Sequence, residues 1–276
     1  MKIFISADME GVAGITAGEQ TDPVGQPEYA RSCQLMTSEV RAACEGAAAA
    51  GASEILVNDS HWNMRNIIHE ELPPDVRLIR GSLKPLSMNQ GVDDSCAAAA
   101  FVGYHAPIGT ADAILDHTYT GETLYDVRIN GERCSEARIN AAVAGSFGVP
   151  VIFISGDQNA CADARAFLPW VEAVEVKRAI GRYAADSLSP ERSREAIAAG
   201  MRRAVSGLAK GAAKPFTFAS PITLELIFTS TAKADMASLL PGAERLDGRT
   251  LRYADPDFLT VFRAFRAMMT LGASVS

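Results

Sequence analysis

The sequence predicts an α/β fold, in which a mostly parallel sheet core is flanked by helices and followed by a smaller C-terminal α+β lobe. Short apolar runs rich in β-forming residues alternate with helical stretches through the first two-thirds of the 276 residues. After about residue 181 the pattern changes to a long helix, an alternating strand and further helices. We therefore expect an α/β domain over residues 1–185 and an α+β lobe over residues 186–276.

The strands of the α/β domain are expected at short apolar runs that end in polar or turn-forming residues. The alanine-rich stretch between the first two runs predicts a helix that closes on Gly51, because glycine readily takes the left-handed conformation past a helix end. A second, shorter helix should end before Pro169. The predicted strands are 2–7, 54–58, 76–79, 97–104, 149–154 and 171–176, and the predicted helices are 29–51 and 158–167.

A hairpin is predicted over residues 124–134, because Asn130-Gly131 favours a type I′ turn between two β-rich runs. Ser135 can then cap a helix that runs to residue 147. In the C-terminal lobe, Ser189 and Pro190 open a helix that extends to about residue 210. Residues 222–228 alternate as a half-buried antiparallel strand does. Helices at 232–239 and 257–271, with a strand at 250–253, complete the lobe.

Composition excludes several classes of function. The formal net charge of −7 disfavours nucleic-acid binding. No apolar stretch approaches 18 residues, so no membrane span is expected, and the N-terminal run is too short for a signal peptide. The five cysteines are scattered and odd in number, which favours reduced thiols in a cytoplasmic protein.

Polar side chains that can bind metal follow several of the predicted strands. In open α/β sheets, ligands bind beyond the carboxyl ends of the strands, so these groups should meet at one edge. Each has an ordinary structural alternative alone: a loop or cap for the D-x-E pair, a core or exposed position for each histidine, and a helix-dipole contact for the last glutamate. The candidate ligands are Asp8, Glu10, His61, His105 and Glu136.

Three carboxylates and two imidazoles suit divalent zinc, although manganese or cobalt can occupy such a site. The set exceeds the three protein ligands of a typical catalytic zinc ion, so two ions sharing one carboxylate are predicted. Because a metal pair activates water, hydrolysis is the expected reaction class.

Further residues near these segments are candidates for other roles. His117 could act as a general acid or base, oriented by Asp116, although an exposed loop position explains it equally well. Asp59 could support the site or cap a helix, and Asp157 could contact substrate from the end of another strand. His69 lies in a polar segment and is expected on a solvated face.

The motifs together resemble the DppA-type D-aminopeptidases, zinc peptidases associated with dipeptide-transport operons. The segment SADMEG at residues 6–11 fits the S-x-D-x-E-G signature of that family, and VNDSH at 57–61 and GYHA at 103–106 extend the match. The stretches NAAVAG at 140–145 and SGD at 155–157 agree as well. The resemblance covers most of the chain and is strongest over residues 1–160.

By this resemblance the five candidate ligands would hold a zinc pair, with Asp8 as the bridging carboxylate. His117 would be the catalytic histidine, which is described in the family as a nucleophile. On chemical grounds we expect hydroxide on the metal to attack, with His117 as acid, base or transition-state stabiliser. The resemblance also implies a homo-oligomer, a ring-stacked decamer with sites facing an internal channel.

One departure from the family pattern concerns the glutamate ligand, which relatives carry in G-E-x-G. Here the stretch is Ser135-Glu136-Ala137-Arg138. We expect Arg138 to contact a substrate carboxylate or to fill space that a D-residue needs, which leaves D-stereospecificity open.

The sequence thus predicts a cytoplasmic di-zinc aminopeptidase that acts on short peptides or amino-acid amides. Hydrolysis of another small amide or a phosphoester is the nearest alternative. A non-catalytic metal-binding assembly protein is a further alternative. A nucleotide-dependent redox enzyme is disfavoured, because a complete G-x-G-x-x-G is missing.

Overall fold

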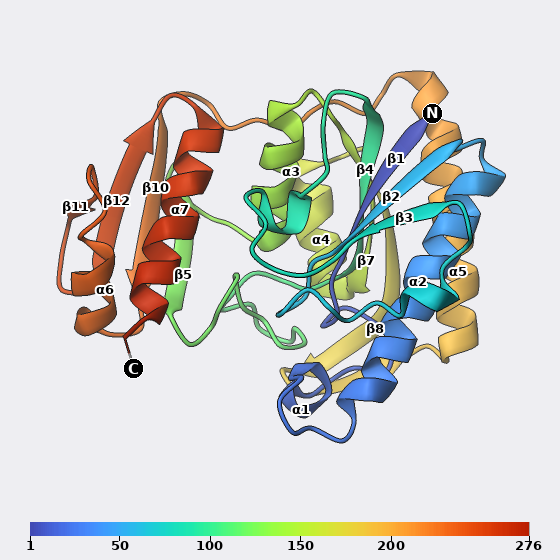
Figure 1. Ribbon diagram of the computed structural model, residues 1–276, viewed down its shortest axis with the longest axis horizontal. Helices are drawn as coiled ribbons and strands as arrows, with labels where there is room; N and C mark the ends of the chain where they lie inside the picture. The colour runs from blue at the N-terminus through green and yellow to red at the C-terminus, as the bar shows by residue number, and fades with distance from the viewer. Residues whose placement is uncertain (276) are drawn as a thin grey trace.

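The computed structural model describes residues 1–275, which form two sheets with helices around and between them (Figure 1). The first sheet has seven strands in the order β3-β2-β1-β4-β7-β8-β9. All neighbours in it are parallel except β8 and β9. The predicted fold class is confirmed. The strands are β1 (Lys2–Ala7), β2 (Glu54–Asp59), β3 (Val76–Ile79), β4 (Cys96–Tyr104), β7 (Val151–Asp157), β8 (Glu172–Gly181) and β9 (Ala184–Ser187).

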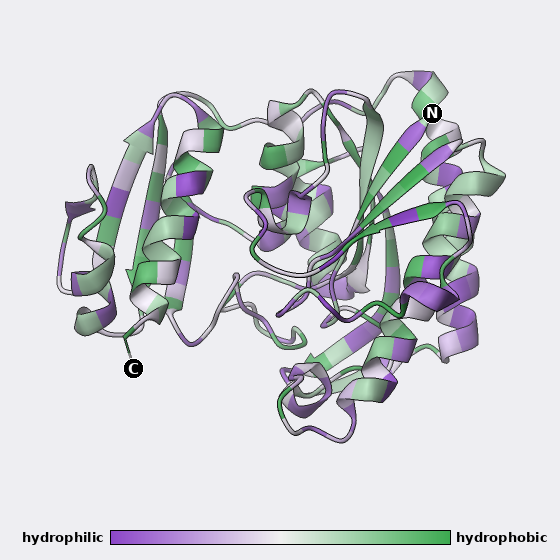
Figure 2. Cartoon of the chain, viewed as in Figure 1, coloured by the Kyte–Doolittle hydropathy of each residue, from purple (hydrophilic) through white to green (hydrophobic). Residues whose placement is uncertain are grey.

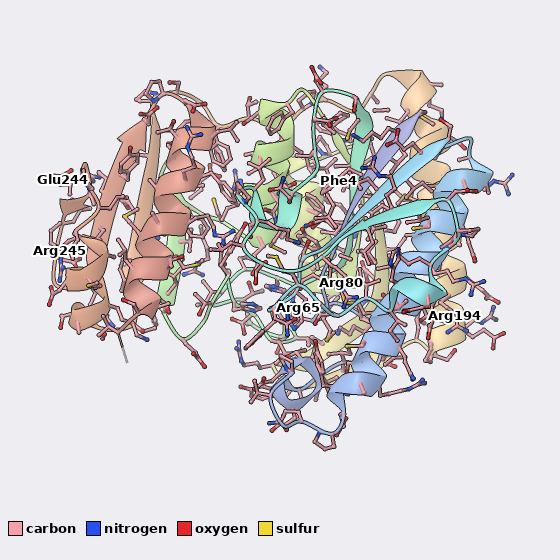
Figure 3. All side chains as sticks on the ribbon, viewed as in Figure 1. Phe4, Arg65, Arg80, Arg194, Glu244 and Arg245 are labelled. Atoms are coloured by element: carbon pink, nitrogen blue, oxygen red, sulfur yellow. The ribbon has the colours of Figure 1, made fainter. Side chains whose placement is uncertain are left out.

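Helices cover both faces of this sheet because its central strands are apolar on both sides. Ile3 and Ile5 of β1 pack in one core with α2 (Tyr29–Ala49) and α5 (Pro190–Gly207). Phe4 points the opposite way, into a second core with α3 (Glu136–Ser146) and α4 (Gln158–Phe167). Figure 2 shows apolar residues along β1 and β2, and Figure 3 shows Phe4 within the sheet. Short helices are α1 (Gly18–Thr21), η1 (His69–Glu71), η2 (Ser87–Asn89) and η3 (Leu208–Lys210).

The second sheet is antiparallel and has the order β11-β12-β10-β5-β6. The charged pair Glu244 and Arg245 forms its outer edge strand, which discourages further pairing (Figure 3). Its strands are β5 (Leu124–Ile129), β6 (Glu132–Arg133), β10 (Ile222–Phe228), β11 (Glu244–Arg245) and β12 (Thr250–Asp255), and α6 (Thr231–Ala237) lies beside it.

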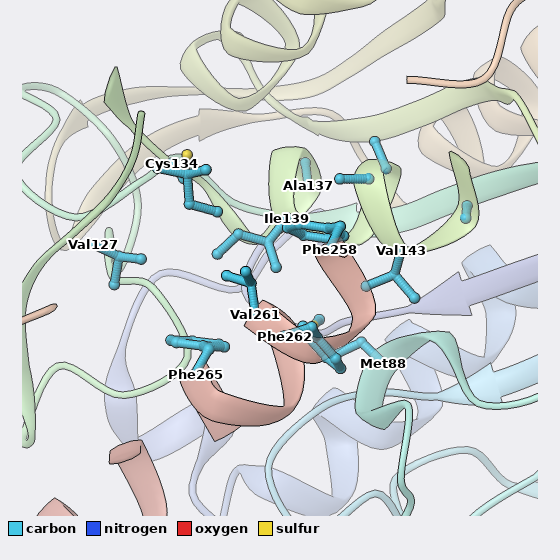
Figure 4. Close-up of a cluster of buried hydrophobic side chains, with 14 of the residues drawn as sticks. Met88, Val127, Cys134, Ala137, Ile139, Val143, Phe258, Val261, Phe262 and Phe265 are labelled. Atoms are coloured by element: carbon cyan, nitrogen blue, oxygen red, sulfur yellow. The ribbon is translucent and has the colours of Figure 1, made fainter. Parts of the chain in front are cut away.

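Helix α7 (Phe258–Ala273) joins the two parts of the molecule. It packs on β10 and β12 of the second sheet and also on α3, which covers the first sheet. Figure 4 shows Phe258, Val261 and Phe262 of α7 beside Ile139 and Val143 of α3. These side chains are buried in one continuous core. The helix therefore packs against both the second sheet and the layer of helices that covers the first sheet.

The predicted boundary between residues 185 and 186 does not coincide with the division between the two sheets. The predicted hairpin is present as β5 and β6, but it pairs with β10 and so belongs to the second sheet. Helix α5 lies beyond the boundary, yet it buries Ile197 and Met201 with α2 on the first sheet. The division into domains remains a prediction. Within residues 1–275, no helix has the length and apolar character needed to cross a membrane.

Candidate metal centre

The five predicted ligands come together at the carboxyl ends of the central strands. Asp8 follows β1, His61 follows β2 and His105 follows β4, while Glu136 is the first residue of α3. All of these residues, together with Glu10, are at least 95% buried. The convergence follows from topology, because neighbouring parallel strands end at the same edge.

Two glycines allow the chain after β1 to lie directly on the end of β4. The N–H of Gly11 donates to the carbonyl of Gly103 at 2.8 Å. A Cβ on Gly11 would lie 2.0 Å from the carbonyl oxygen of Tyr104. Gly103 has a φ of +71° and would bring a Cβ to 2.3 Å from the Asp8 carbonyl oxygen. This close approach brings Asp8 and Glu10 next to His105.

Asp8 lies at the centre of the cluster, between two groups of ligands. Its Oδ1 is 3.1 Å from Nδ1 of His61, and the same nitrogen is 3.1 Å from Oε2 of Glu10. Its Oδ2 is 3.6 Å from Nε2 of His105, which is 3.2 Å from Oε1 of Glu136. Asp8 thus lies between two histidine–glutamate pairs, one formed by His61 and Glu10 and the other by His105 and Glu136.

Hydrogen bonds fix which nitrogen of each histidine faces the carboxylates. Nε2 of His61 donates to the carbonyl of Thr21 at 2.8 Å, which leaves the lone pair of Nδ1 toward Asp8 and Glu10. Nδ1 of His105 donates to the carbonyl of Ala106 at 3.0 Å, which leaves Nε2 toward the cluster. Such backbone contacts orient metal-binding imidazoles.

Two buried atoms of the cluster have no hydrogen-bond partner among the described residues, Oε2 of Glu10 and Nε2 of His105. With the tautomers described above, lone pairs of nitrogen and carboxylate oxygen face one another at 3.1–3.6 Å. Such an arrangement of acceptors requires a cation or additional protons between them. The nitrogen and oxygen donors therefore fit divalent metal.

The electrostatics of the protein without metal show the same requirement. Burial, reinforced by the negative charge of Glu10, raises the pKa of Asp8 to about 8. Burial alone would lower the pKa of His105, but Glu136 and Asp8 outweigh it and raise that pKa to about 10. The cluster thus retains protons at neutral pH when no other positive charge is present.

His117 lies beside the cluster and its ring stacks on His105, with 4.0 Å between the centroids. Its Nδ1 donates to the carbonyl of Leu115 at 2.8 Å, and its Nε2 is 3.5 Å from Oε1 of Glu136. The backbone carbonyl, rather than Asp116, thus orients the ring. Burial and the nearby His105 lower the pKa of His117. These contacts favour a neutral ring with a free Nε2.

The backbone around His117 is strained on both sides. Leu115 has a φ of 49° and Tyr119 a φ of 63°, values that side-chain-bearing residues seldom adopt. The N–H of Tyr119 donates to Oε1 of Glu136 at 2.7 Å. This segment therefore holds both His117 and Glu136 in place.

The structure does not bring Arg138 and Asp157 into the cluster. The guanidinium of Arg138 pairs with Glu132 and lies among the rings of Phe167, Phe216 and Phe218, each within 5.8 Å. These contacts show that Arg138, a residue of α3, packs against neighbouring phenylalanines. Asp157 is fully buried and caps α4 by accepting from Asn159 and Ala160.

Asp59 stabilises the segment of chain that follows His61. Its carboxylate accepts hydrogen bonds from the N–H groups of Asn66 and Ile67, at 2.6 and 2.8 Å. The side-chain amide of Asn66 in turn donates to the carbonyl of His61 at 2.7 Å. His69, predicted on a solvated face, is exposed.

A cavity of about 180 Å³ opens on the cluster, and a cleft of about 730 Å³ adjoins it. Glu10, His61 and Trp62 line both spaces. The cavity is also lined by Tyr119 and by Arg266 of α7. Sequence reasoning missed Trp62, Tyr119 and Arg266. Trp62 directly follows His61 and Tyr119 lies two residues after His117, so both carried a local signal, whereas Arg266 did not.

Comparison with known proteins agrees with this geometry. The sequence profile of the peptidase M55 family, described as D-aminopeptidase, matches residues 1–267. The chain belongs to this family. It is 34% identical over 280 residues to a D-aminopeptidase of Bacillus subtilis, covering 100% of this chain and 99% of that one.

A solved member of the family has the same fold. The zinc-dependent D-aminopeptidase DppA of Bacillus subtilis, described as a self-compartmentalizing protease, superimposes with a TM-score of 0.95 and 34% identity. The match covers 100% of this chain and 99% of that one. The predicted family and enzyme class are confirmed, and the phosphoesterase, assembly-protein and redox alternatives are not favoured.

Proposed function

We propose that the protein is a di-zinc aminopeptidase that removes the N-terminal residue, in the D configuration, from short peptides or amino-acid amides. Family membership supports the reaction and the configuration. The observation that carries the metal pair is the position of Asp8, whose two oxygens face His61 on one side and His105 on the other.

Asp8 would contribute to both zinc ions, each of which would also be held by one histidine and one glutamate. Glu10 and His61 would complete the protein ligands of one ion, and His105 and Glu136 those of the other. The unpartnered atoms of Glu10 and His105 support this division. Five side chains serving two ions with one shared carboxylate is a typical arrangement of two-metal hydrolases.

When bound, a zinc pair supplies Lewis-acid chemistry for the attack of water on a peptide carbonyl. His117 provides the proton transfer: its free Nε2 faces the cluster, while Nδ1 is held by the Leu115 carbonyl. It can take a proton from the attacking water and return it to the departing amine. Its side chain is 20% exposed, against 1% for that of His105, so it has access to substrate in the cavity.

Two further features of the biological setting are part of the proposal. The description of DppA as self-compartmentalizing supports a homo-oligomer, and we propose a ring-stacked decamer. The five cysteines are free and buried, which supports the reducing environment of the cytoplasm.

Elemental analysis and hydrolysis assays test this function together. We expect two zinc ions per chain and release of free amino acid from D-aminoacyl amides, with slower turnover of the L-amides. A chelator should abolish turnover and zinc should restore it. Phosphate release from a phosphoester panel, or turnover that is indifferent to chelator, would contradict the proposal.

A further inference from the structure

Arg266 provides a positively charged group in a cavity that otherwise carries acidic ligands. It lies on α7 and lines the cavity together with Met269, one turn along the same helix. Its guanidinium carbon lies 6.0 Å from the ring centroid of Tyr119, whose backbone N–H is bonded to Glu136. Arg266 is therefore separated from a predicted metal ligand by a single residue.

The guanidinium of Arg266 is not neutralised within the described part of the chain. Its Nε and Nη1 atoms are buried and have no hydrogen-bond partner. Between residues 1 and 275 no carboxylate forms an ion pair with it, whereas Arg263 on the same helix lies 3.9 Å from Asp257. Arg266 is half-buried and lines the cavity, so a carboxylate bound there would supply acceptors that its guanidinium lacks.

A second cation, Lys84, lies close enough to Arg266 for their charges to interact. Lys84 is buried and donates to Oδ1 of Asn58 at 2.7 Å and to the carbonyl of Asp59 at 2.6 Å. Its pKa is lowered to about 8 by burial, with Arg266 acting in the same direction. Of these two cations, Arg266 lines the cavity, which the carboxylates of Asp8 and Glu10 also line.

The volume of the cavity limits the size of the ligand that it can hold. Its volume of about 180 Å³ lies below the roughly 300–1,000 Å³ of sites for drug-sized ligands. A short ligand with one free carboxylate matches both the size of the cavity and the charge of Arg266, because Asp8 and Glu10 are assigned to the metal ions. Guanidinium groups bind carboxylates through two parallel hydrogen bonds.

We propose that Arg266 binds the free C-terminal carboxylate of the substrate, which makes the enzyme selective for short peptides that end near the scissile bond. This specificity role rests on the proposed peptidase function. Arg138, for which the sequence predicted such a contact, has its guanidinium paired with Glu132.

The test compares two substrates that differ only in the terminal charge, D-alanyl-D-alanine and its C-terminal amide. The wild-type enzyme should prefer the free acid. Arg266→Met should lower kcat/KM for the acid by about 10- to 100-fold and change that for the amide by no more than about twofold. Arg266→Lys, which keeps the charge but not the fork, should retain part of the preference.

Arg263→Met is the matched control, because Arg263 lies on the same helix with its side chain 70% exposed. It should leave both rates unchanged. An equal loss for the acid and the amide in Arg266→Met would overturn the proposal and would indicate a structural or general catalytic role. If Arg266→Met does not fold, a reduced preference for the acid in Arg266→Lys supports the proposal, and an unchanged preference refutes it.

Failure of the peptidase function itself would look different. In that case the wild type would cleave neither compound, and calorimetric titration would still measure their binding. Tighter binding of the acid than the amide, lost in Arg266→Met, supports the carboxylate site without turnover. Equal binding of the two compounds refutes it.

Discussion

The imidazole rings of His105 and His117 lie nearly parallel, with 11° between their planes. Both Nε2 atoms face the same oxygen of Glu136, at 3.2 and 3.5 Å. Both Nδ1 atoms donate to backbone carbonyls. The two rings are thus held alike but differ in exposure, which leads us to assign metal binding to His105 and proton transfer to His117.

Substitution of His117 by glutamine should separate these roles. Loss of a general acid or base typically lowers the rate by about 10²- to 10⁴-fold, so we expect kcat to fall in that range while zinc content stays at the wild-type value. Kinetics and elemental analysis of the same preparation check this. His69→Gln, at an exposed position, is the control. Loss of zinc in His117→Gln would show that the residue is a ligand.

Asp8→Asn should affect both metal positions, because each side of this carboxylate faces a different histidine. The amide nitrogen of asparagine cannot replace a carboxylate oxygen as a ligand. We expect zinc affinity to fall by more than the roughly 10- to 100-fold seen when only supporting groups are lost. Dialysis against graded zinc concentrations measures this, with the exposed Asp93→Asn as control. Unchanged binding of two ions would argue against a shared carboxylate.

Gly11→Ala tests the close approach of the chain after β1 to the end of β4. The added methyl group would meet the Tyr104 carbonyl oxygen at 2.0 Å, which the backbone cannot relieve without moving Glu10. We expect the free energy of unfolding to fall by about 1–3 kcal/mol, with loss of activity. Gly18→Ala has no atom within 4 Å of the new Cβ and should be neutral in urea unfolding.

Lys177 links this loop to the first sheet and predicts a dependence of stability on pH. Its Nζ donates to the carbonyls of Glu10, Val12 and Ile15, and burial lowers its pKa from 10.5 to about 8. Because the folded pKa lies below the unfolded value, its contribution to stability is fully present above pH 10.5 and is lost as pH falls through 8.

The destabilisation caused by Lys177→Met should therefore be greater at pH 10 than at pH 7, by about 2–3 kcal/mol. Urea unfolding of both proteins at the two pH values measures the difference. Lys214→Met, at an exposed position, should show no such change between them. A difference that does not vary with pH would contradict the prediction.

Sequence reasoning found the parts of the site that depend on local order along the chain. Asp8, His61 and His105 each follow a recognisable apolar run, and the rule that parallel strands share an edge brings them together. Arg266 follows no such rule, because its position depends on how α7 packs between the second sheet and α3. Arg138 was favoured instead because it is near Glu136 in sequence, although its side chain packs among phenylalanines.

The sequence did not predict, for a similar reason, that the β5–β6 hairpin belongs to the second sheet. The hairpin itself is encoded by Asn130-Gly131, a local signal. Its partner strand is not: Thr223 donates to the side chain of Asn130 across 93 positions of sequence. Alternation in β10 predicts an antiparallel partner without specifying which one.

This long-range pairing bears on the order in which the protein is assembled during synthesis. Strands β5 and β6 leave the ribosome well before β10, and α7 follows every other described element. The hairpin therefore has an unpaired edge during part of translation, and helix α7, which carries Arg266, is added late. A nascent chain would contain the acidic ligands before it contains Arg266, so substrate specificity would be established only after α7 has docked.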